Sequence, residues 1–551
     1  MSSKDFDLDE VFLDSANMPG FDTNHMEGRI EKPISRTSIF MIGGFFALIA
    51  IIFIGRVYWF QVAMGEEYVK ISERNHLKHI PIFSVRGVIY DRNKKELAWN
   101  TVSEKDIFPK RSYGDAPGIA HLLGYVSHPK VDSKGNFWQT EVTGKEGAEK
   151  EFDEVLRGEN GVRLVESDVM GELKSEVSQR LPIDGDNVVL SIDSRVSTKL
   201  YETMEALSKQ VGFTGGAGVI IDVNNGEILA LSSYPEYSSQ VLSNGDQSKI
   251  INSLLLNKNK PFLNRVTSGL YTPGSTVKPF LAAGALQNKI IDPNKQIYSP
   301  GYISIPNRYF PDQPSIFKDW RANGWTDVRR ALAVSSDVYF YAIGGGYADQ
   351  KGLGIKEIER IMRMFGFGEK IGIDFATEVA GTIPSPEWKI KNFAEGKWLL
   401  GDTYHTSIGQ YGTQVSPLQL ARATAAIANG GTLYIPHIKM GEENLPSTVI
   451  PISPENFKII REGMKMAVDE GTAKGLQISG VSIGAKTGTA ELGAKKEFVN
   501  AWIMGFFPYE KPRYAFVVVM EKGPHENTVG GLYVMRQVLE WMVVNTPEYL
   551  K

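Results

Sequence analysis

The sequence predicts an α+β protein in which one apolar helix near the N-terminus precedes a long folded region. Three observations lead to this expectation. The chain has 551 residues, enough for several domains. Residues 37–55 contain no charged side chain. Two pairs of strand-like segments, within residues 216–233 and 499–522, are each joined by turn-forming residues. We therefore expect an antiparallel sheet covered by helices.

The composition excludes several classes of protein. With 42% hydrophobic and 23% charged residues, the chain can bury a core and is not a disordered protein. Its 60 basic and 64 acidic side chains give a net charge of -4, so we expect no nucleic acid partner. Cysteine is absent, and the eight histidines have neither HExxH nor HxxEH spacing. We therefore predict no metal and no cofactor.

Residues 37–61 are predicted to form a transmembrane helix, because the apolar run reaches the ~20 residues that cross a bilayer. Arg29, Lys32 and Arg36 precede it, so the positive-inside rule places the N-terminus in the cytoplasm. Residues 1–36 then form a cytoplasmic tail, and the chain from residue 62 onward is periplasmic or extracytoplasmic. A buried core helix is the alternative, but this segment has no polar face. A cleaved signal peptide is disfavoured by the long preceding tail.

The segment from residue 62 to residue 183 is predicted to be a first external domain. We expect a helix over residues 66–79 and a hairpin over residues 86–100, which turns at Asn93 and Lys94. A short amphipathic helix within residues 144–161 is expected to end at Gly158.

Residues 184–551 are predicted to form one larger domain. Asn225 and Gly226 are the strongest short hairpin signal in the chain, because both residues tolerate positive φ. A second hairpin is expected over residues 499–522, and a closing helix over residues 531–544.

Ser275 and Lys278 form an S-x-x-K motif after Pro273 and Gly274, at the start of an apolar helical run. We expect the serine in the first turn of a helix, with the lysine on the same face and within reach of its hydroxyl. A neutral lysine there would activate the serine as a nucleophile. The alternative is an ordinary helix cap. A second S-x-x-K, residues 315–318, follows Pro- and Asn-rich sequence, which indicates a loop.

Two further motifs follow the first. Lys486, Thr487, Gly488 and Thr489 are predicted to form a strand edge that lets a peptide approach closely while its carboxylate is held. The alternative is a plain edge strand. Between the two, residues 335–337 read Ser-Ser-Asp after a helical segment and offer a second hydroxyl. A helix cap or turn is the alternative for this motif.

Together and in this order, the three motifs resemble those of the penicilloyl-serine transferases. The segments RGVIYDRN and GAEKEFDEVLRG resemble the non-catalytic pedestal of class B, monofunctional penicillin-binding proteins. Residues 407–431 are similar to the segment before the family's third motif. Residues 118–127 and the aspartate at position 337 resemble the elongation type, penicillin-binding protein 2, more than the septal type. The resemblance covers about residues 38 to 545.

The resemblance implies a penicillin-binding/β-lactamase-like transpeptidase domain over residues 184–551 and a pedestal, or dimerisation-type, domain over residues 62–183. It implies D,D-transpeptidation of peptidoglycan stem peptides in cell-wall elongation, with β-lactams as substrate mimics. It also implies anchorage in the cytoplasmic membrane. The expected partners are a glycosyltransferase of the SEDS family and other proteins of the elongation complex.

The resemblance further assigns roles to the motif residues. Ser275 is the expected nucleophile and Lys278 the general base, made neutral by burial and by a nearby cation. Ser335 is expected to pass a proton to the leaving amine, and Asp337 to orient the polar network.

The third motif is expected to bind the substrate. Lys486, which is also counted among the catalytic residues, and Thr487 would hold the terminal carboxylate, and Gly488 would leave room for it. The backbone N–H groups of Ser275 and Thr489 would form the oxyanion hole.

The chain departs from the pattern in two places. Twenty residues lie between Asn100 and His121, where the elongation type usually carries a larger head subdomain. Residues 276–334 contain no histidine or cysteine, although some relatives hold zinc there. Alternatives are a septal class B transpeptidase, a β-lactamase or D,D-carboxypeptidase, and a non-catalytic scaffold for a SEDS glycosyltransferase. A bifunctional enzyme is excluded, because residues 61–184 are too few for a glycosyltransferase domain.

Overall fold

The computed structural model describes residues 35–103, 106–133, 136–167, 173–306, 312–394, 396–442, 446–493, 495–527 and 529–551. The chain divides into two compact units. The first contains Met1–Ile80 and Leu164–Val177, and the second contains Pro81–Arg163 and Ser178–Lys551. The predicted cytoplasmic tail lies almost wholly outside the described residues.

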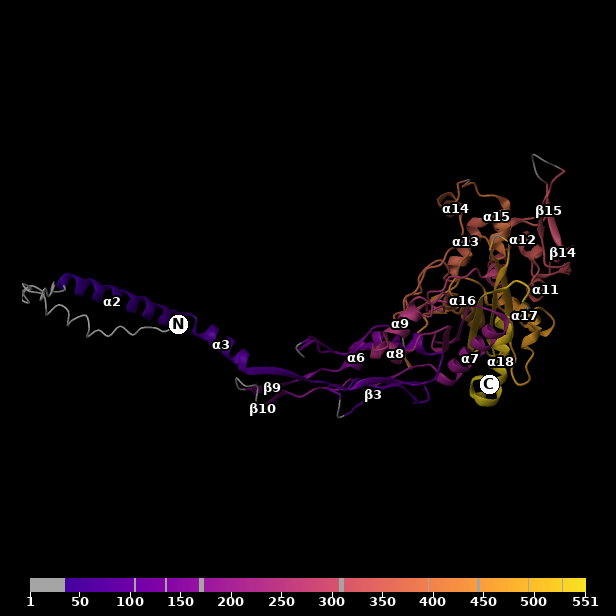
Figure 1. Ribbon diagram of the computed structural model, residues 1–551. Coiled ribbons are helices and arrows are strands. Elements are labelled where there is room, and N and C mark those ends of the chain that lie inside the picture. Colours follow the sequence, from indigo (N-terminus) through magenta and orange to yellow (C-terminus); the bar gives the residue numbers. More distant parts are fainter. Residues whose placement is uncertain are drawn as a thin grey trace, which may run out of the picture. The chain divides into compact units, whose positions relative to one another are not determined.

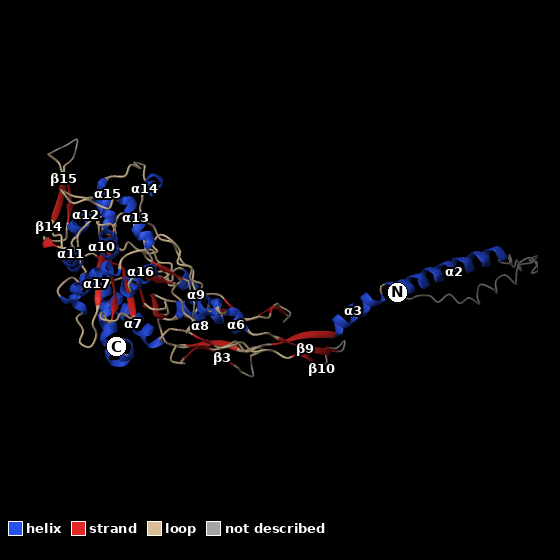
Figure 2. Cartoon of the chain, turned by 180° about the vertical axis from the view of Figure 1, so that it is seen from behind, coloured by secondary structure: helices blue, strands red, loops and turns tan. Residues whose placement is uncertain are grey.

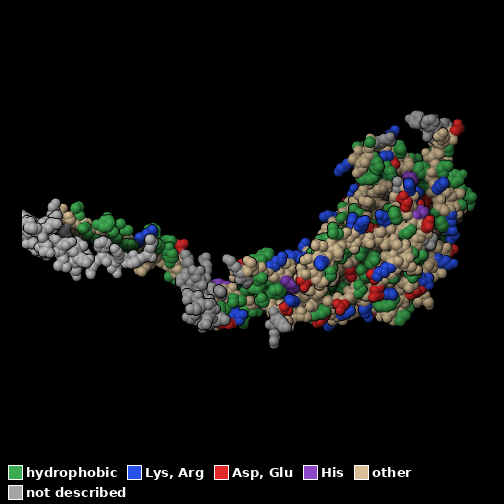
Figure 3. Space-filling view, viewed as in Figure 1, with side chains coloured by type: hydrophobic (Ala, Val, Ile, Leu, Met, Phe, Trp, Pro, Cys, Tyr) green, Lys and Arg blue, Asp and Glu red, His purple; other side chains and the backbone are tan. Residues whose placement is uncertain are grey.

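The first unit contains a long exposed helix, α2 (Arg36–Tyr58), which continues as the π-helical turn η3 (Trp59–Ala63) (Figure 1). These 28 residues are long and apolar enough to cross a membrane, and none of the most apolar part is buried. Figure 3 shows hydrophobic side chains, in green, along this helix. Helix α3 (Gly65–His76) follows, and it ends earlier than predicted because strand β1 (Leu77–Ile82) begins there. Strand β1 lies at one edge of a three-stranded sheet in the order β1-β9-β10, with β9 (Gly161–Ser167) and β10 (Leu173–Arg180).

The second unit begins with the hairpin that the sequence predicts. Strands β2 (Ile89–Tyr90) and β3 (Glu96–Thr101) pair antiparallel, and Lys94 in their turn has a φ of 63°. Strands β4 (Lys110–Tyr113) and β11 (Val188–Val189) complete this four-stranded sheet. The remaining short elements are α4 (Ala120–Leu123), β5 (Val126–Ser127), β6 (Lys130–Val131), β7 (Phe137–Gln139), β8 (Thr143–Gly144), α5 (Gly147–Glu151) and α6 (Asp153–Arg157). Helix α6 ends at Gly158, as predicted, with a φ of 66°.

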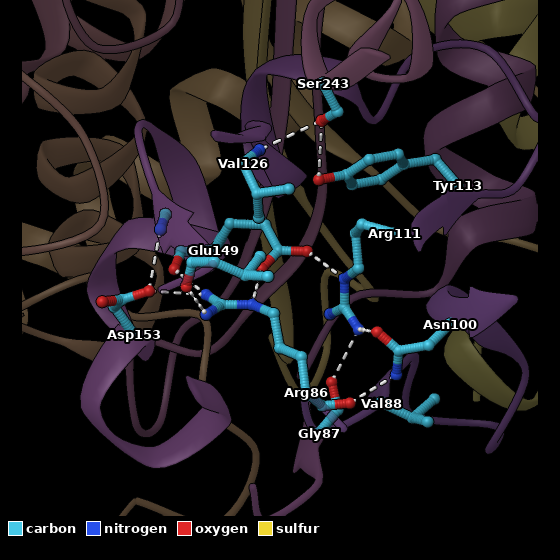
Figure 4. A network of polar contacts seen from close by, with 12 residues as sticks. Arg86, Gly87, Val88, Asn100, Arg111, Tyr113, Val126, Glu149, Asp153 and Ser243 are labelled. Carbon is cyan, nitrogen blue, oxygen red and sulfur yellow. Dashed lines mark hydrogen bonds and ion pairs between the residues drawn. The ribbon is translucent and has the colours of Figure 1, made fainter. Parts of the chain in front are cut away.

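A buried ionic network joins these elements (Figure 4). Glu149 accepts hydrogen bonds from Arg86 Nε at 2.7 Å and from Arg111 Nε at 2.6 Å, and the three side chains are at most 2% exposed. Arg86 also pairs with Asp153 at 2.8 Å. Burial alone raises the pKa of Glu149, but the two guanidinium groups outweigh it and hold the pKa below its ordinary value. Arg86 of RGVIYDRN and Glu149 of GAEKEFDEVLRG are therefore part of the core of this region.

The largest sheet has five antiparallel strands in the order β13-β12-β22-β21-β20 (Figure 2). Their bounds are β12 (Gly215–Asp222), β13 (Ile228–Tyr234), β20 (Gly484–Leu492), β21 (Phe498–Phe507) and β22 (Tyr514–Pro524). Both predicted hairpins form, β12 with β13 and β21 with β22. Gly226, in the first turn, has a φ of 88°.

Helices cover both faces of this sheet. Ile220 and Val518 pack in one core with residues of α7 (Ser194–Val211) and α18 (Gly531–Asn545). Their strand neighbours Val219 and Val517 pack in a second core with residues of α16 (Pro417–Asn429). Each fully buried side chain of this size contributes about 1.5 to 3 kcal/mol, so both layers stabilise the sheet. The predicted α+β architecture is confirmed.

The remaining helices and short strands of this unit have the following bounds. The helices are α8 (Ser239–Asn244), α9 (Ser248–Leu255), η4 (Gly274–Val277), α10 (Lys278–Gln287), α11 (Val328–Val334), α12 (Asp337–Gly345), α13 (Ile355–Met364), α14 (Pro386–Asn392), α15 (Leu400–Ser407), α17 (Pro454–Asp469), η5 (Lys474–Leu476) and η6 (Pro547–Tyr549). The short strands are β14 (Ile297–Ser299), β15 (Tyr302–Ile305), β16 (Ser315–Lys318), β17 (Gly324–Thr326), β18 (Thr432–Tyr434) and β19 (Ser447–Val449). The second S-x-x-K is therefore strand β16, which pairs with β15, and not the predicted loop.

Candidate active site

Ser275 lies in the 3-10 turn η4, one turn before helix α10 begins at Lys278. The serine therefore lies in the first turn of a continuous helical run, as predicted, and this first turn is 3-10 rather than α-helical. Gly274 has a φ of 55°, and a Cβ atom there would lie 2.5 Å from the carbonyl oxygen of Thr489. Because only glycine tolerates both conditions, this residue lets the serine turn pack against strand β20.

Ser335 is held between two helices in a left-handed backbone conformation, with φ 57° and ψ 42°. Helix α11 ends before it, and helix α12 begins at Asp337. Ser336 caps α12, because its side chain accepts a hydrogen bond from the backbone N–H of Tyr339. The cap is thus made by Ser336, which leaves Ser335 and Asp337 for other contacts.

The three sequence motifs meet at Ser335. Lys278 Nζ lies 2.6 Å from Asp337 Oδ1, 2.9 Å from the Ser335 carbonyl oxygen and 3.3 Å from Ser335 Oγ. Lys486 Nζ lies 2.8 Å from Ser335 Oγ and 2.9 Å from the carbonyl oxygen of Thr487. Both lysines are fully buried. Two amines therefore bind a single hydroxyl, and one of these amines also binds a carboxylate.

Within this cluster, the structure lowers the pKa of Lys486, the lysine of the third motif. Burial, and then the charge of Lys278, place the pKa of Lys486 well below its ordinary value, although Asp337 opposes the shift. The sequence instead predicts a neutral Lys278. In the structure, Lys278 forms an ion pair with Asp337, a carboxylate 59 residues away in the chain.

The predicted contact between Ser275 and Lys278 is not made in this structure. Within the described part of the chain, no hydrogen bond joins the Ser275 hydroxyl to another group, and Lys278 Nζ binds Ser335 and Asp337 instead. Ser275 nevertheless lines the same cleft as Ser335 and Asp337.

Strand β20 carries the third motif at the edge of the large sheet. Thr487 donates its hydroxyl hydrogen to Thr472 Oγ1 at 2.8 Å. A Cβ atom at Gly488 would lie 2.6 Å from the Thr276 side chain and 2.8 Å from the Pro273 carbonyl oxygen. Gly488 therefore lets strand and serine turn pack closely, a reason that the sequence argument did not consider.

A cleft of about 1240 Å³ contains these groups. Sequence reasoning found Ser275, Ser335, Asp337 and residues 487–489 of its lining. It missed other lining residues, because they come from separate helices, strands and loops that share no motif: Phe317, Trp320, His405, Tyr411, Thr472, Glu491, Lys496 and Trp502. Among the residues that the structure describes, no group of three or more His, Cys, Asp or Glu is placed to hold a metal ion. The absence of a metal stays a prediction.

Comparison with known proteins agrees with the resemblance. Residues 216–539 match the family described as Penicillin binding protein transpeptidase domain, and residues 104–190 match the Penicillin-binding Protein dimerisation domain. The chain belongs to the penicillin-binding protein transpeptidase family.

Three relatives show how far the similarity extends. The peptidoglycan D,D-transpeptidase MrdA of Acinetobacter baumannii is 28% identical, over 91% of this chain and 87% of that protein. The structure of Pseudomonas aeruginosa PBP2 in complex with WCK 5153 has a TM-score of 0.70 at 30% identity, over 86% of this chain and 98% of that one. Helicobacter pylori PBP2, solved in complex with MreC, has a TM-score of 0.70 at 27% identity, over 85% of this chain and 99% of that one.

These findings confirm the predicted recognition, fold class and enzyme class. The chain is a class B penicillin-binding protein similar to penicillin-binding protein 2, with a serine-type D,D-transpeptidase domain. Its N-terminal apolar helix is a candidate membrane anchor.

Proposed function

We propose that this protein cross-links peptidoglycan stem peptides during cell-wall elongation through an acyl-enzyme on Ser275, and that β-lactams acylate the same serine. One observation carries the proposal. Ser275 lines a cleft in which the Ser335 hydroxyl lies between the amines of Lys278 and Lys486. Such an arrangement would carry the proton of Ser275 through a buried network once the Lys278 amine comes within hydrogen-bond distance of the serine.

The first chemical step needs a neutral amine next to Ser275. The lowered pKa of Lys486 provides a neutral amine, but at the far side of Ser335. A proton passed from Lys278 through the Ser335 hydroxyl to Lys486 would leave Lys278 neutral. A substrate carboxylate bound near Lys486 and Thr487 would favour this transfer, because it stabilises the new ammonium group. Substrate binding would thus prepare Lys278 as the general base.

Acylation then follows. Ser275 Oγ forms a bond to the carbonyl carbon of the penultimate D-Ala, and its proton goes to Lys278. The bond to the terminal D-Ala breaks, and its nitrogen takes a proton by way of Ser335. The amine of a second stem peptide attacks the ester, forms the new amide, and returns a proton to Ser275 Oγ. Asp337 keeps Lys278 in position through the 2.6 Å ion pair.

The edge of strand β20 and the serine turn would stabilise the charges of this reaction. We assign the oxyanion hole to the backbone N–H groups of Ser275 and Thr489, where each donor is typically worth about 3 to 4 kcal/mol. Support comes from the close packing of Gly274 on the Thr489 carbonyl, which brings the two segments together. Lys486 and Thr487 would hold the terminal carboxylate, next to the small Gly488.

We also propose the arrangement of the chain at the membrane. Residues 1–36 form the cytoplasmic tail, 37–61 the transmembrane helix, 62–183 the pedestal and 184–551 the transpeptidase domain. The basic residues before the helix place the N-terminus in the cytoplasm and the catalytic domain in the periplasm or its equivalent. The expected partners are a SEDS-family glycosyltransferase and proteins of the elongation complex, and the complex of the Helicobacter pylori relative with MreC supports this class of partner.

Intact-protein mass spectrometry of the full-length protein in detergent, followed over time after addition of benzylpenicillin, tests the proposal. We expect a stable adduct on the peptide that contains Ser275 and no adduct on Ser275→Ala. No adduct on the wild-type protein, or equal labelling of Ser275→Ala, would overturn the assignment. An adduct that disappears within minutes would favour a β-lactamase or carboxypeptidase. Full complementation of a deletion strain by Ser275→Ala would favour the scaffold.

A further inference from the structure

The backbone of Ser335 adopts a conformation that serine rarely takes. Its φ of 57° and ψ of 42° lie in the left-handed region, which favours glycine. A residue in this region persists only where the surrounding structure fixes it, and such residues gather at active sites. The contacts on either side of Ser335 therefore determine where its hydroxyl lies between Lys278 and Lys486.

The segment on the N-terminal side of Ser335 is held by Trp320. Helix α11 ends at Val334, and the last carbonyl groups of a helix have no partner within it. Trp320 Nε1 donates a hydrogen bond to the carbonyl oxygen of Val334 at 3.1 Å. The Arg321 guanidinium lies over the indole ring, 4.3 Å from its centre. Because Trp320 also lines the cleft, its hydrogen bond joins the cleft wall to the residue before Ser335.

The segment on the C-terminal side of Ser335 is held by Asp319, which also lines the cleft. Asp319 Oδ2 accepts hydrogen bonds from Ser336 Oγ at 2.8 Å and from the backbone N–H of Val338 at 3.1 Å. Ser336 caps helix α12, so one carboxylate fixes both the cap and the first turn of that helix. Ser335 is thus the one residue between a helix end that binds Trp320 and a helix start that binds Asp319.

Asp319 is itself fixed by further contacts. Its Oδ2 atom accepts hydrogen bonds from Ser299 Oγ and from Asn323 Nδ2, each at 3.1 Å. Its Oδ1 atom accepts one from the backbone N–H of Trp320 at 2.9 Å. The residue is 9% exposed. Hydrogen bonds from strand β14, from the loop after β16 and from the start of α12 therefore converge on one buried carboxylate, and such a network is rigid.

We propose that Asp319 and Trp320 are positioning residues that hold the Ser335 hydroxyl in place for proton transfer. Trp320 acts through the Val334 carbonyl, and Asp319 acts through Ser336 and the first turn of α12. This inference rests on the proposed function, in which Ser335 passes a proton to the leaving amine.

A double-mutant cycle on the full-length protein in detergent tests the positioning role. The measurement is the second-order rate constant for acylation by a fluorescent penicillin. Trp320→Phe keeps an aromatic ring but removes the donor to the Val334 carbonyl. We expect this change to slow acylation about fivefold, the usual effect of one hydrogen bond. In a Ser335→Ala background the same change should have an effect below about twofold, because the hydroxyl that Trp320 positions is absent.

Variants of Asp319 extend the cycle. Asp319→Ala removes the acceptor for Ser336 and Val338, and we expect it to slow acylation by roughly 30-fold, the effect of about two hydrogen bonds. Asp319→Asn keeps one acceptor oxygen and should recover most of the rate. Asp319→Ala should also have an effect below about twofold in the Ser335→Ala background.

Two matched substitutions serve as controls. Trp325→Phe, at a tryptophan that is 64% exposed, and Asp349→Ala, at a side chain that is 87% exposed, should acylate at the wild-type rate. Wild-type rates in Trp320→Phe and Asp319→Ala, or equal slowing with and without the Ser335 hydroxyl, would overturn the inference. If thermal unfolding shows that Asp319→Ala is not folded, the cycle with Trp320→Phe decides the question. If the penicillin does not acylate the wild-type protein, the proposed function itself fails, which is a different result.

Discussion

Two buried clusters in this protein each contain two basic side chains, but their chemistry differs. In the pedestal region, Glu149 lies between Arg86 and Arg111, and Arg86 also pairs with Asp153. In the cleft, Ser335 Oγ lies between the amines of Lys278 and Lys486, and Asp337 pairs with Lys278. The pedestal uses guanidinium groups, which do not lose a proton in proteins, whereas the cleft uses amines, which can.

Burial of charged groups stabilises the structure in the pedestal region and changes reactivity in the cleft. The two arginines hold the pKa of Glu149 below its ordinary value. Arg111 Nη1 donates to the backbone carbonyl of Gly87, and Arg86 Nη1 donates to that of Val142. In the cleft one carboxylate does not compensate two buried ammonium groups, and the pKa of Lys486 is lowered. The pedestal cluster is therefore a fixed structural link, and the cleft cluster is prepared for proton transfer.

The largest effect is expected from Glu149→Gln. Arg111 would lose its carboxylate partner and Arg86 would lose one of its two, and breaking such a buried pair typically costs about 3 to 5 kcal/mol of folding free energy. Thermal or urea unfolding of the full-length protein measures the loss. Glu141→Gln removes the exposed partner of Arg157 and is the matched control, with an expected loss below about 1 kcal/mol. Equal losses in the two variants would contradict the structural role of the pedestal cluster.

The stability that the Glu149 ion pairs contribute depends on pH, and the direction follows from the lowered pKa of Glu149. The pKa of Glu149 is lower in the folded protein than its ordinary value of 4.5. Its stabilising contribution is therefore present above pH 4.5 and is lost as the pH falls through the folded pKa. We expect the stability of the wild-type protein to decrease more steeply on acidification below pH 4.5 than that of Glu149→Gln. Parallel curves of stability against pH for the wild-type protein and Glu149→Gln would contradict a stabilising role of the Glu149 ion pairs.

Lys486→Arg should separate charge from proton transfer in the cleft. Arginine keeps the positive charge but has no neutral form in this pH range, so it cannot receive the proton from Ser335. We expect acylation by a fluorescent penicillin to slow by about 100-fold, the range of a lost general acid or base. Lys474→Arg, at an exposed lysine, is the control and should acylate at the wild-type rate. A wild-type rate in a folded Lys486→Arg variant would contradict the proton path.

Arg111→Lys makes the opposite exchange and should have the smallest effect. Lysine keeps the charge but cannot reproduce the separate contacts of Arg111 with Glu149 and the Gly87 carbonyl. We expect a loss of about 1 to 2 kcal/mol of stability, roughly one hydrogen bond. The acylation rate should not change, because Arg111 touches no residue of the cleft cluster. A slower acylation at full stability would show that the two clusters are coupled.

Local signals in the sequence were enough to predict much of the fold. The hairpin at Gly226 and the helix end at Gly158 were correct, because positive φ at a glycine is a local requirement. The predicted end of the first external helix at residue 79 was wrong. The helix ends at His76, because the next residues pair in a sheet as strand β1. The strand conformation of residues 315–318 was missed for the same reason, since β15 supplies the partner.

The sequence predicted which residues belong to the candidate site but not which of them contact one another. The motifs name Ser275, Lys278, Ser335, Asp337 and residues 486–489 without any structure. They do not say that Asp337 pairs with Lys278, or that Ser335 bridges the two lysines, because those contacts join segments 57 to 151 residues apart.

The pH dependence of acylation shows whether a buried amine of this cluster is neutral at ordinary pH. The measurement is the second-order rate constant for acylation of Ser275 by a fluorescent penicillin, taken over the pH range in which the protein stays folded. Because an amine accepts a proton only when neutral, the rate should fall with decreasing pH through an apparent pKa far below 10.5, the ordinary value for lysine. A profile that still rises through pH 10, with no inflection below it, would contradict the account.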